Sequence, residues 1–90
     1  MLASANPEVG DRVAALVRRI MDQRAIVRPV GPDEDLRTCG LSSLQIVTLM
    51  LSVEMEFAVK IPEREMIPAN FRSIARIAGL VGALLRQPAA

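Results

Sequence analysis

The sequence predicts an all-α domain: a four-helix bundle with a long loop between the first and second helices and a short third helix. Apolar residues recur at helical spacing in several segments, and no segment alternates apolar and polar residues as a half-buried strand does. The chain is 51% hydrophobic but has only two aromatic residues, so aliphatic side chains must form the core, which favours helices. Ninety residues suffice for one domain, and we expect a single domain over 1–90, with its core at 7–86 and flexible tails at 1–5 and 87–90.

The first helix is expected to begin at Asn6-Pro7-Glu8. Asn suits the cap, Pro the first helical position, and Glu the positive end of the helix dipole. Apolar residues then recur at helical spacing as far as Ile20, and we expect fraying over 21–24.

Residues 25–41 contain two prolines and two glycines and predict a long ordered loop. Its apolar residues would tie it to the core: Ile26, Val27, Val30 and Leu36. A loop of this length in a compact domain is often functional.

Three further helices are predicted, over 43–57, over 63–67 after Ile61-Pro62, and from the capping residue Ser73 onward. The last of them has an apolar face formed by Ile74, Ile77, Ala78, Val81 and Leu84 or Leu85.

Charge and composition exclude several classes of function. The net charge of +1 is not that of a nucleic-acid binder. Without histidine the chain cannot build a Ser-His-Asp triad, and with one cysteine, Cys39, it is not expected to bind zinc or any other metal. A lone cysteine indicates a reducing compartment, and neither a membrane span nor a signal peptide is evident. We therefore expect a cytoplasmic protein that has no catalytic residues of its own.

The predicted helix over 43–57 has two apolar faces when its residues are placed at about 100° each on a helical wheel. The obvious core face comprises Ile46, Leu49, Met50, Val53 and Phe57. A second stripe on roughly the opposite side comprises Leu44, Val47, Leu51 and Met55. Periodicity leaves two interpretations open: the 25–41 loop covers this second stripe, or the stripe is an exposed docking surface for a partner.

Two adjacent serines begin the same helix. Ser42 is well placed as the cap, and Ser43 would then be the first helical residue, with its hydroxyl at the exposed positive end of the helix. A phosphate attached to Ser43 would occupy a natural anion site. The simpler interpretation is that both serines only begin a helix.

The context of the serines adds a family resemblance. The segment Gly40-Leu41-Ser42-Ser43-Leu44 opens a helix that ends at Glu56-Phe57, and Val59-Lys60-Ile61-Pro62 and Phe71-Arg72-Ser73-Ile74 follow. In this order and spacing the chain resembles the acyl and peptidyl carrier proteins over residues 9–85. Its GLSS segment resembles in particular the small stand-alone bacterial carriers, among them aminoacyl carrier proteins that are loaded by dedicated ligases.

The resemblance implies that Ser43 carries a covalent 4'-phosphopantetheine arm, whose thiol holds an amino acid or acyl group as a thioester. It implies three partners: a phosphopantetheinyl transferase, a ligase that activates the amino acid or acyl group, and a downstream acyltransferase or synthase. The carrier itself would be a monomer and not an enzyme, and Cys39 would take no part. Partners would dock on the second stripe and its rim: Leu44, Val47, Leu51, Glu54 and Met55.

The chain departs from the family pattern in two respects. Ser42 replaces the aspartate that usually precedes the modified serine, and Thr48 and Met55 stand where related carriers often have acids. One other function stays open, an unmodified helical interaction module that uses the same stripe. A nucleic-acid binder that uses Arg64, Arg72, Arg76 and Arg86 is disfavoured, because no aromatic stacking platform accompanies these arginines and a solvated helix face explains them.

Overall fold

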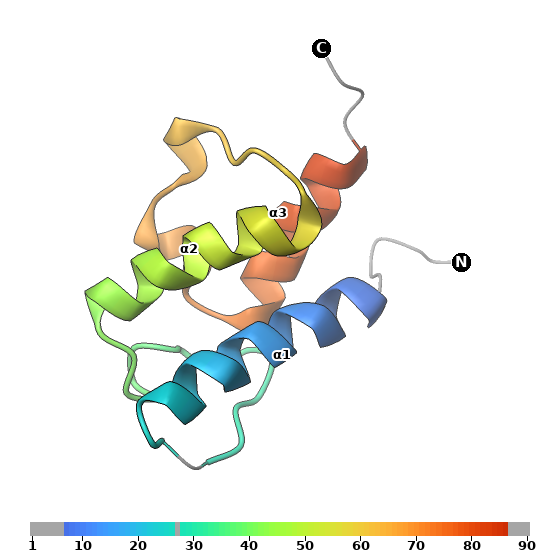
Figure 1. The fold of residues 1–90 in the computed structure, drawn as a ribbon. Coiled ribbons are helices and arrows are strands. Elements are labelled where there is room, and N and C mark those ends of the chain that lie inside the picture. Colours follow the sequence, from blue (N-terminus) through green and yellow to red (C-terminus); the bar gives the residue numbers. More distant parts are fainter. Residues whose placement is uncertain (1–6, 27, 87–90) are drawn as a thin grey trace.

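The computed structural model describes residues 7–26 and 28–86, and this part of the chain is helical, without strands (Figure 1). Its α-helices are α1 (Pro7–Gln23), α2 (Ser43–Phe57) and α3 (Ile74–Arg86). Two short 3₁₀ helices, η1 (Glu63–Glu65) and η2 (Pro68–Phe71), lie between α2 and α3. The expected cap Asn6, the expected contact of Val27 and the expected flexible tails at 1–5 and 87–90 lie outside the described residues.

Helix α1 packs against both α2 and α3, and η2 packs against both α2 and α3 (Figure 1). Both predicted boundaries of α2 are confirmed, and α3 begins where the sequence predicts. The N-cap of α3 is Ser73, whose hydroxyl oxygen accepts a hydrogen bond from the Arg76 backbone N–H at 3.2 Å. Among the described residues no helix has the combination of length and apolar content that a membrane crossing needs.

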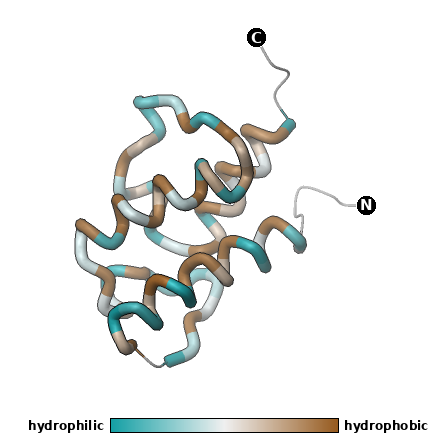
Figure 2. The backbone as a smooth tube through the Cα atoms, in the orientation of Figure 1, coloured by the Kyte–Doolittle hydropathy of each residue, from teal (hydrophilic) through white to brown (hydrophobic). Residues whose placement is uncertain are grey.

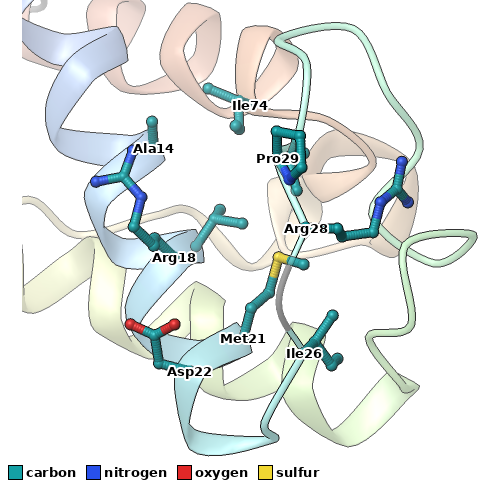
Figure 3. A pocket seen from close by; sticks show the side chains of 10 residues that line it. Ala14, Arg18, Met21, Asp22, Ile26, Arg28, Pro29 and Ile74 are labelled. Atoms are coloured by element: carbon teal, nitrogen blue, oxygen red, sulfur yellow. The ribbon is translucent and has the colours of Figure 1, made fainter.

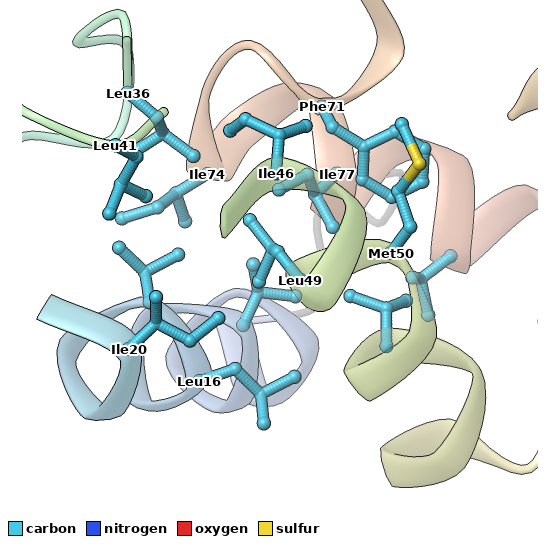
Figure 4. Close-up of a cluster of buried hydrophobic side chains, with 14 of the residues drawn as sticks. Leu16, Ile20, Leu36, Leu41, Ile46, Leu49, Met50, Phe71, Ile74 and Ile77 are labelled. Atoms are coloured by element: carbon cyan, nitrogen blue, oxygen red, sulfur yellow. The ribbon is translucent and has the colours of Figure 1, made fainter. Parts of the chain in front are cut away.

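One aliphatic core joins the three α-helices, the loop and η2. In α1 polar residues separate the apolar ones at helical spacing, so that one side of the helix faces the core, whereas α2 is apolar over most of its length (Figure 2). The side chains of Leu49, Val53 and Ile77 are completely buried, as is the aromatic ring of Phe71. Leu36 and Leu41 of the loop point into the same cluster, beside Ile46 and Ile74 (Figure 4).

The predicted short helix over 63–67 is not an α-helix, so the described chain has three α-helices rather than four. The reason lies in Pro68. A proline disfavours helical dihedral angles in the residue before it, and Ile67 is extended, with φ −122° and ψ 147°. The chain therefore forms the separate 3₁₀ helices η1 and η2 on either side of Met66-Ile67.

The loop between α1 and α2 is ordered by hydrogen bonds to the start of α3, as predicted. The Leu36 N–H donates to the Arg72 carbonyl oxygen at 2.8 Å, and the Ala75 N–H donates to the Pro32 carbonyl oxygen at 2.8 Å. Within the loop, the Leu41 N–H donates to the Leu36 carbonyl oxygen at 3.2 Å. These bonds turn residues 36–41 tightly, with Leu36 and Leu41 as the buried ends of the turn.

Gly40 is the residue that this turn requires. Its φ is +111°, a conformation that residues with a side chain rarely adopt, and an added Cβ would lie 3.1 Å from Cδ1 of Ile26. We therefore expect Gly40→Ala to lower the free energy of unfolding by about 1–3 kcal/mol.

The matched control is Gly10→Ala, because an added Cβ at this helical position meets nothing within 4 Å. That substitution should stabilise the protein by about 0.5–1 kcal/mol through helix propensity. Urea unfolding of both variants measures the two effects. Equal stability of Gly40→Ala and the wild type would show that the turn does not constrain the fold.

Candidate functional site

The two serines at the start of α2 have different roles, as predicted. Ser42 is the N-cap: its hydroxyl oxygen accepts a hydrogen bond from the Gln45 N–H at 3.3 Å, and the Gln45 side-chain oxygen accepts one from the Ser42 N–H at 3.0 Å. Ser43 is the first helical residue and is exposed. Within the described residues its hydroxyl makes no hydrogen bond. Of the two hydroxyls, that of Ser43 is thus the one left unbonded within the described residues.

The surroundings of the Ser43 hydroxyl suit a phosphate group. The first backbone bond of α2 runs from the Ile46 N–H to the Ser42 carbonyl oxygen at 3.0 Å. The N–H groups of Ser43 and Leu44 precede it, at the positive end of the helix dipole, where they can donate to an anion. The Arg37 side chain lines the same small pocket as Ser43 and adds a positive charge.

The pocket beside Ser43 is small, at ≈ 110 Å³. It is lined by Arg37, Ser43, Ile46, Val47, Met50 and Pro68. It lies directly beside the exposed Ser43 hydroxyl and is mostly apolar, so a small apolar group attached near that hydroxyl would find a matching surface there.

A larger cavity of ≈ 470 Å³ lies between α1 and the loop (Figure 3). Its lining comes from α1, from residues 26 and 28–30, and from Ile74, and it includes the charged side chains of Arg18, Asp22 and Arg28. No residue of α2 lines it, and it shares no residue with the pocket at Ser43. The sequence pattern gave no signal for this cavity.

The second apolar stripe of α2 is exposed, and the loop does not cover it. The exposed fractions are 70% for Leu44, 48% for Val47, 51% for Leu51 and 84% for Met55. Val47 also lines the pocket at Ser43, so the stripe continues up to the hydroxyl. Helical periodicity left open whether the stripe is covered by the loop or exposed, and the structure shows that it is exposed.

Both acids of α2 have structural partners that the sequence did not reveal. Glu54, expected at the rim of the docking surface, is half-buried and accepts a hydrogen bond from the Ile61 N–H at 2.8 Å, so it holds the segment that follows α2. Glu56 pairs with Arg12 at 2.9 Å, and the Arg12 guanidinium lies 4.4 Å from the centre of the Phe57 ring. The stripe itself therefore carries no free carboxylate of α2.

Comparison with known proteins identifies the family. A family profile described as "Phosphopantetheine attachment site" matches residues 11–81. Aminoacyl carrier protein 1 of Bradyrhizobium diazoefficiens is 40% identical over 84 residues, which cover 93% of this chain and 92% of the relative. The chain belongs to the family of aminoacyl carrier proteins. This carrier is also 46% identical to aminoacyl carrier protein 2 of the same organism over 66 residues, 73% of this chain and 74% of that one.

A solved structure matches the carrier as well. It is the crystal structure of Bradyrhizobium japonicum glycine:[carrier protein] ligase complexed with its cognate carrier protein and an analogue of glycyl adenylate. The matching chain has a TM-score of 0.70 and 39% identity, over 83% of this carrier and 97% of that chain.

Membership of this family makes the protein a carrier and not an enzyme, with a covalently attached 4'-phosphopantetheine. The group supplies a thiol that holds cargo as a thioester. The chain's own thiol is not suited to that task, because Cys39 is 4% exposed. Burial, followed by the negative charge of Glu34, raises the pKa of the Cys39 thiol and keeps it protonated.

Thiol labelling tests this division of roles. At neutral pH we expect the native protein without the arm to react only slowly with a maleimide, and the protein with the arm to take up one equivalent rapidly. Denaturant should expose Cys39 and add one further equivalent. Rapid labelling of Cys39 in the native, arm-free protein would contradict this expectation.

Proposed function

We propose that the protein is an aminoacyl carrier whose amino acid is held as a thioester on a 4'-phosphopantetheine arm attached to Ser43. The observation that carries the proposal is the division of roles at the start of α2. The hydroxyl of Ser42 is engaged in the cap, whereas that of Ser43 is exposed at an anion-binding helix end.

Two observations support an amino acid as the cargo. Both relatives compared above are named aminoacyl carrier proteins, and the matching solved chain comes from a complex with a glycine:[carrier protein] ligase.

The exposed stripe supports the choice of partners. We propose that a phosphopantetheinyl transferase adds the arm, an amino acid-activating ligase loads it, and an acyltransferase or synthase receives the cargo. Each would contact Leu44, Val47, Leu51 and Met55 in turn, next to Ser43. The stripe must be free for these partners, which supports a monomer, and the free thiol of Cys39 agrees with the cytoplasm as the site of action.

Intact-mass spectrometry after incubation with coenzyme A and a broad-specificity phosphopantetheinyl transferase tests the attachment site. The wild type should gain one phosphopantetheine and Ser43→Ala none. Ser42→Ala should still gain it, although loss of the cap lowers stability by about 1 kcal/mol.

A Ser42→Asp variant sharpens this test. Aspartate keeps the capping function and supplies the acid that usually precedes the modified serine. We expect faster modification of Ser43 in this variant than in the wild type. A mass gain that persists in Ser43→Ala would contradict attachment at Ser43. No mass gain in either the wild type or Ser42→Asp would contradict the proposal and favour an unmodified interaction module.

The docking surface is tested by loading kinetics with a glycine:[carrier protein] ligase. Leu51→Glu places a charge in the stripe and should lower the loading rate by about fivefold or more, as for a residue at the centre of an interface. The matched control is Leu85→Glu on α3, because the two leucines are 51% and 49% exposed.

The same assay tests the chemistry of the interface. Because the stripe offers no free carboxylate of α2, the loading rate should change little with salt. Normal loading of Leu51→Glu, or a steep loss of rate with salt, would contradict an apolar docking surface.

A further inference from the structure

Arg37 lies in a turn of the loop that backbone hydrogen bonds hold in place. The turn that holds it is fixed at Leu36, whose N–H donates to the Arg72 carbonyl oxygen at 2.8 Å, and at Leu41, whose N–H donates to the Leu36 carbonyl oxygen at 3.2 Å. Leu36 and Leu41 are both buried in the core (Figure 4). The Arg37 N–H itself donates to Oδ1 of Asp35 at 2.9 Å. The position of the Arg37 backbone is therefore set by the fold.

The guanidinium of Arg37 has no protein partner in the part of the chain that the structure describes. Two acids of the loop, Glu34 and Asp35, lie near the side chains of other arginines. Glu34 pairs with Arg28 and accepts the Gly31 N–H at 2.9 Å, and Asp35 lies 4.0 Å from Nε of Arg72. An arginine that is fixed at its backbone and free at its tip is able to bind an anion.

The pocket beside Ser43 brings this arginine to the attachment site. Arg37 and Ser43 line the same ≈ 110 Å³ space, together with the apolar side chains of Ile46, Val47, Met50 and Pro68. A basic residue, the positive end of a helix and an apolar lining thus share one small pocket with Ser43. The start of a phosphopantetheine arm has the matching order: a phosphodiester, then an apolar dimethyl group.

We propose that Arg37 is a positioning residue that binds the phosphodiester of the arm on Ser43 and directs the adjoining dimethyl group into the pocket. This inference rests on the proposed attachment at Ser43. Contact with Arg37 and with the N–H groups of Ser43 and Leu44 would hold the base of the arm, while its distal part and thiol extend from the pocket. Partners would then meet an arm whose starting direction is set by the loop, beside the exposed stripe.

The test uses the protein with its arm, in the wild type and in Arg37→Gln, Arg37→Lys and Arg86→Gln. Arg86→Gln is the matched control, because it removes the same charge at the far end of α3, away from the start of α2 (Figure 1). Intact mass first establishes that each variant carries the arm. The readouts are the ³¹P resonance of the phosphodiester and the nuclear Overhauser effects between the dimethyl group of the arm and the methyl groups of Val47 and Met50.

We expect Arg37→Gln to weaken these Overhauser effects by about two- to fivefold, the range that corresponds to one exposed charged contact, and to shift the ³¹P resonance. Arg37→Lys should retain part of the effect because it keeps the charge, and Arg86→Gln should match the wild type. Unchanged spectra in Arg37→Gln would overturn this inference and leave the attachment site intact. Absence of the arm from Ser43 would overturn the proposed attachment and this inference with it.

Discussion

The capping box between Ser42 and Gln45 fixes where α2 begins, and the positions of the functional side chains follow from that start. The helix start decides which side chain caps the free backbone N–H groups and which residue is the first helical one, whereas the 3.6-residue period decides which side chains face inward. With Ser42 as the cap, Ser43 lies at the exposed end and Ile46 enters the core. A start displaced by one residue would make Ser43 the cap and engage its hydroxyl.

The loop contributes as much to the site as the helix does. Gly40, with its positive φ, lets the chain turn sharply just before the cap, and the bonds of Leu36 and Leu41 hold that turn against the core. The same turn brings Arg37 to the pocket at Ser43. The long loop thus forms part of the proposed attachment site and does not cover α2, whose second stripe faces solvent. With Glu54 and Glu56 held by protein partners, that stripe offers apolar contact in place of charge.

Much of the fold follows from local sequence signals. The bounds of α2, the capping by Ser42 and Ser73 and the burial of Leu36 are confirmed, because each depends on neighbouring residues or on helical periodicity. The short helix predicted over 63–67 forms only as the 3₁₀ helix η1 over Glu63–Glu65, because Pro68 keeps Ile67 extended.

The remaining features depend on contacts between distant segments. The path of the loop decides whether the second stripe is covered. Helical periodicity gives no information about that path. Three further features likewise join segments whose relative placement appears only in the folded chain. They are the hydrogen bond from Ile61 to Glu54, the ion pair of Arg12 with Glu56, and the pocket that Arg37 and Ser43 share.

We propose above all that the carrier holds an amino acid on an arm at the start of α2. The most direct test is the intact mass of the arm-bearing protein after incubation with ATP, a mixture of amino acids and a glycine:[carrier protein] ligase. We expect a gain of one aminoacyl group that hydroxylamine removes, as it does a thioester. An arm that takes up no amino acid, while an acyl-activating enzyme loads it with a long acyl chain, would contradict the claim.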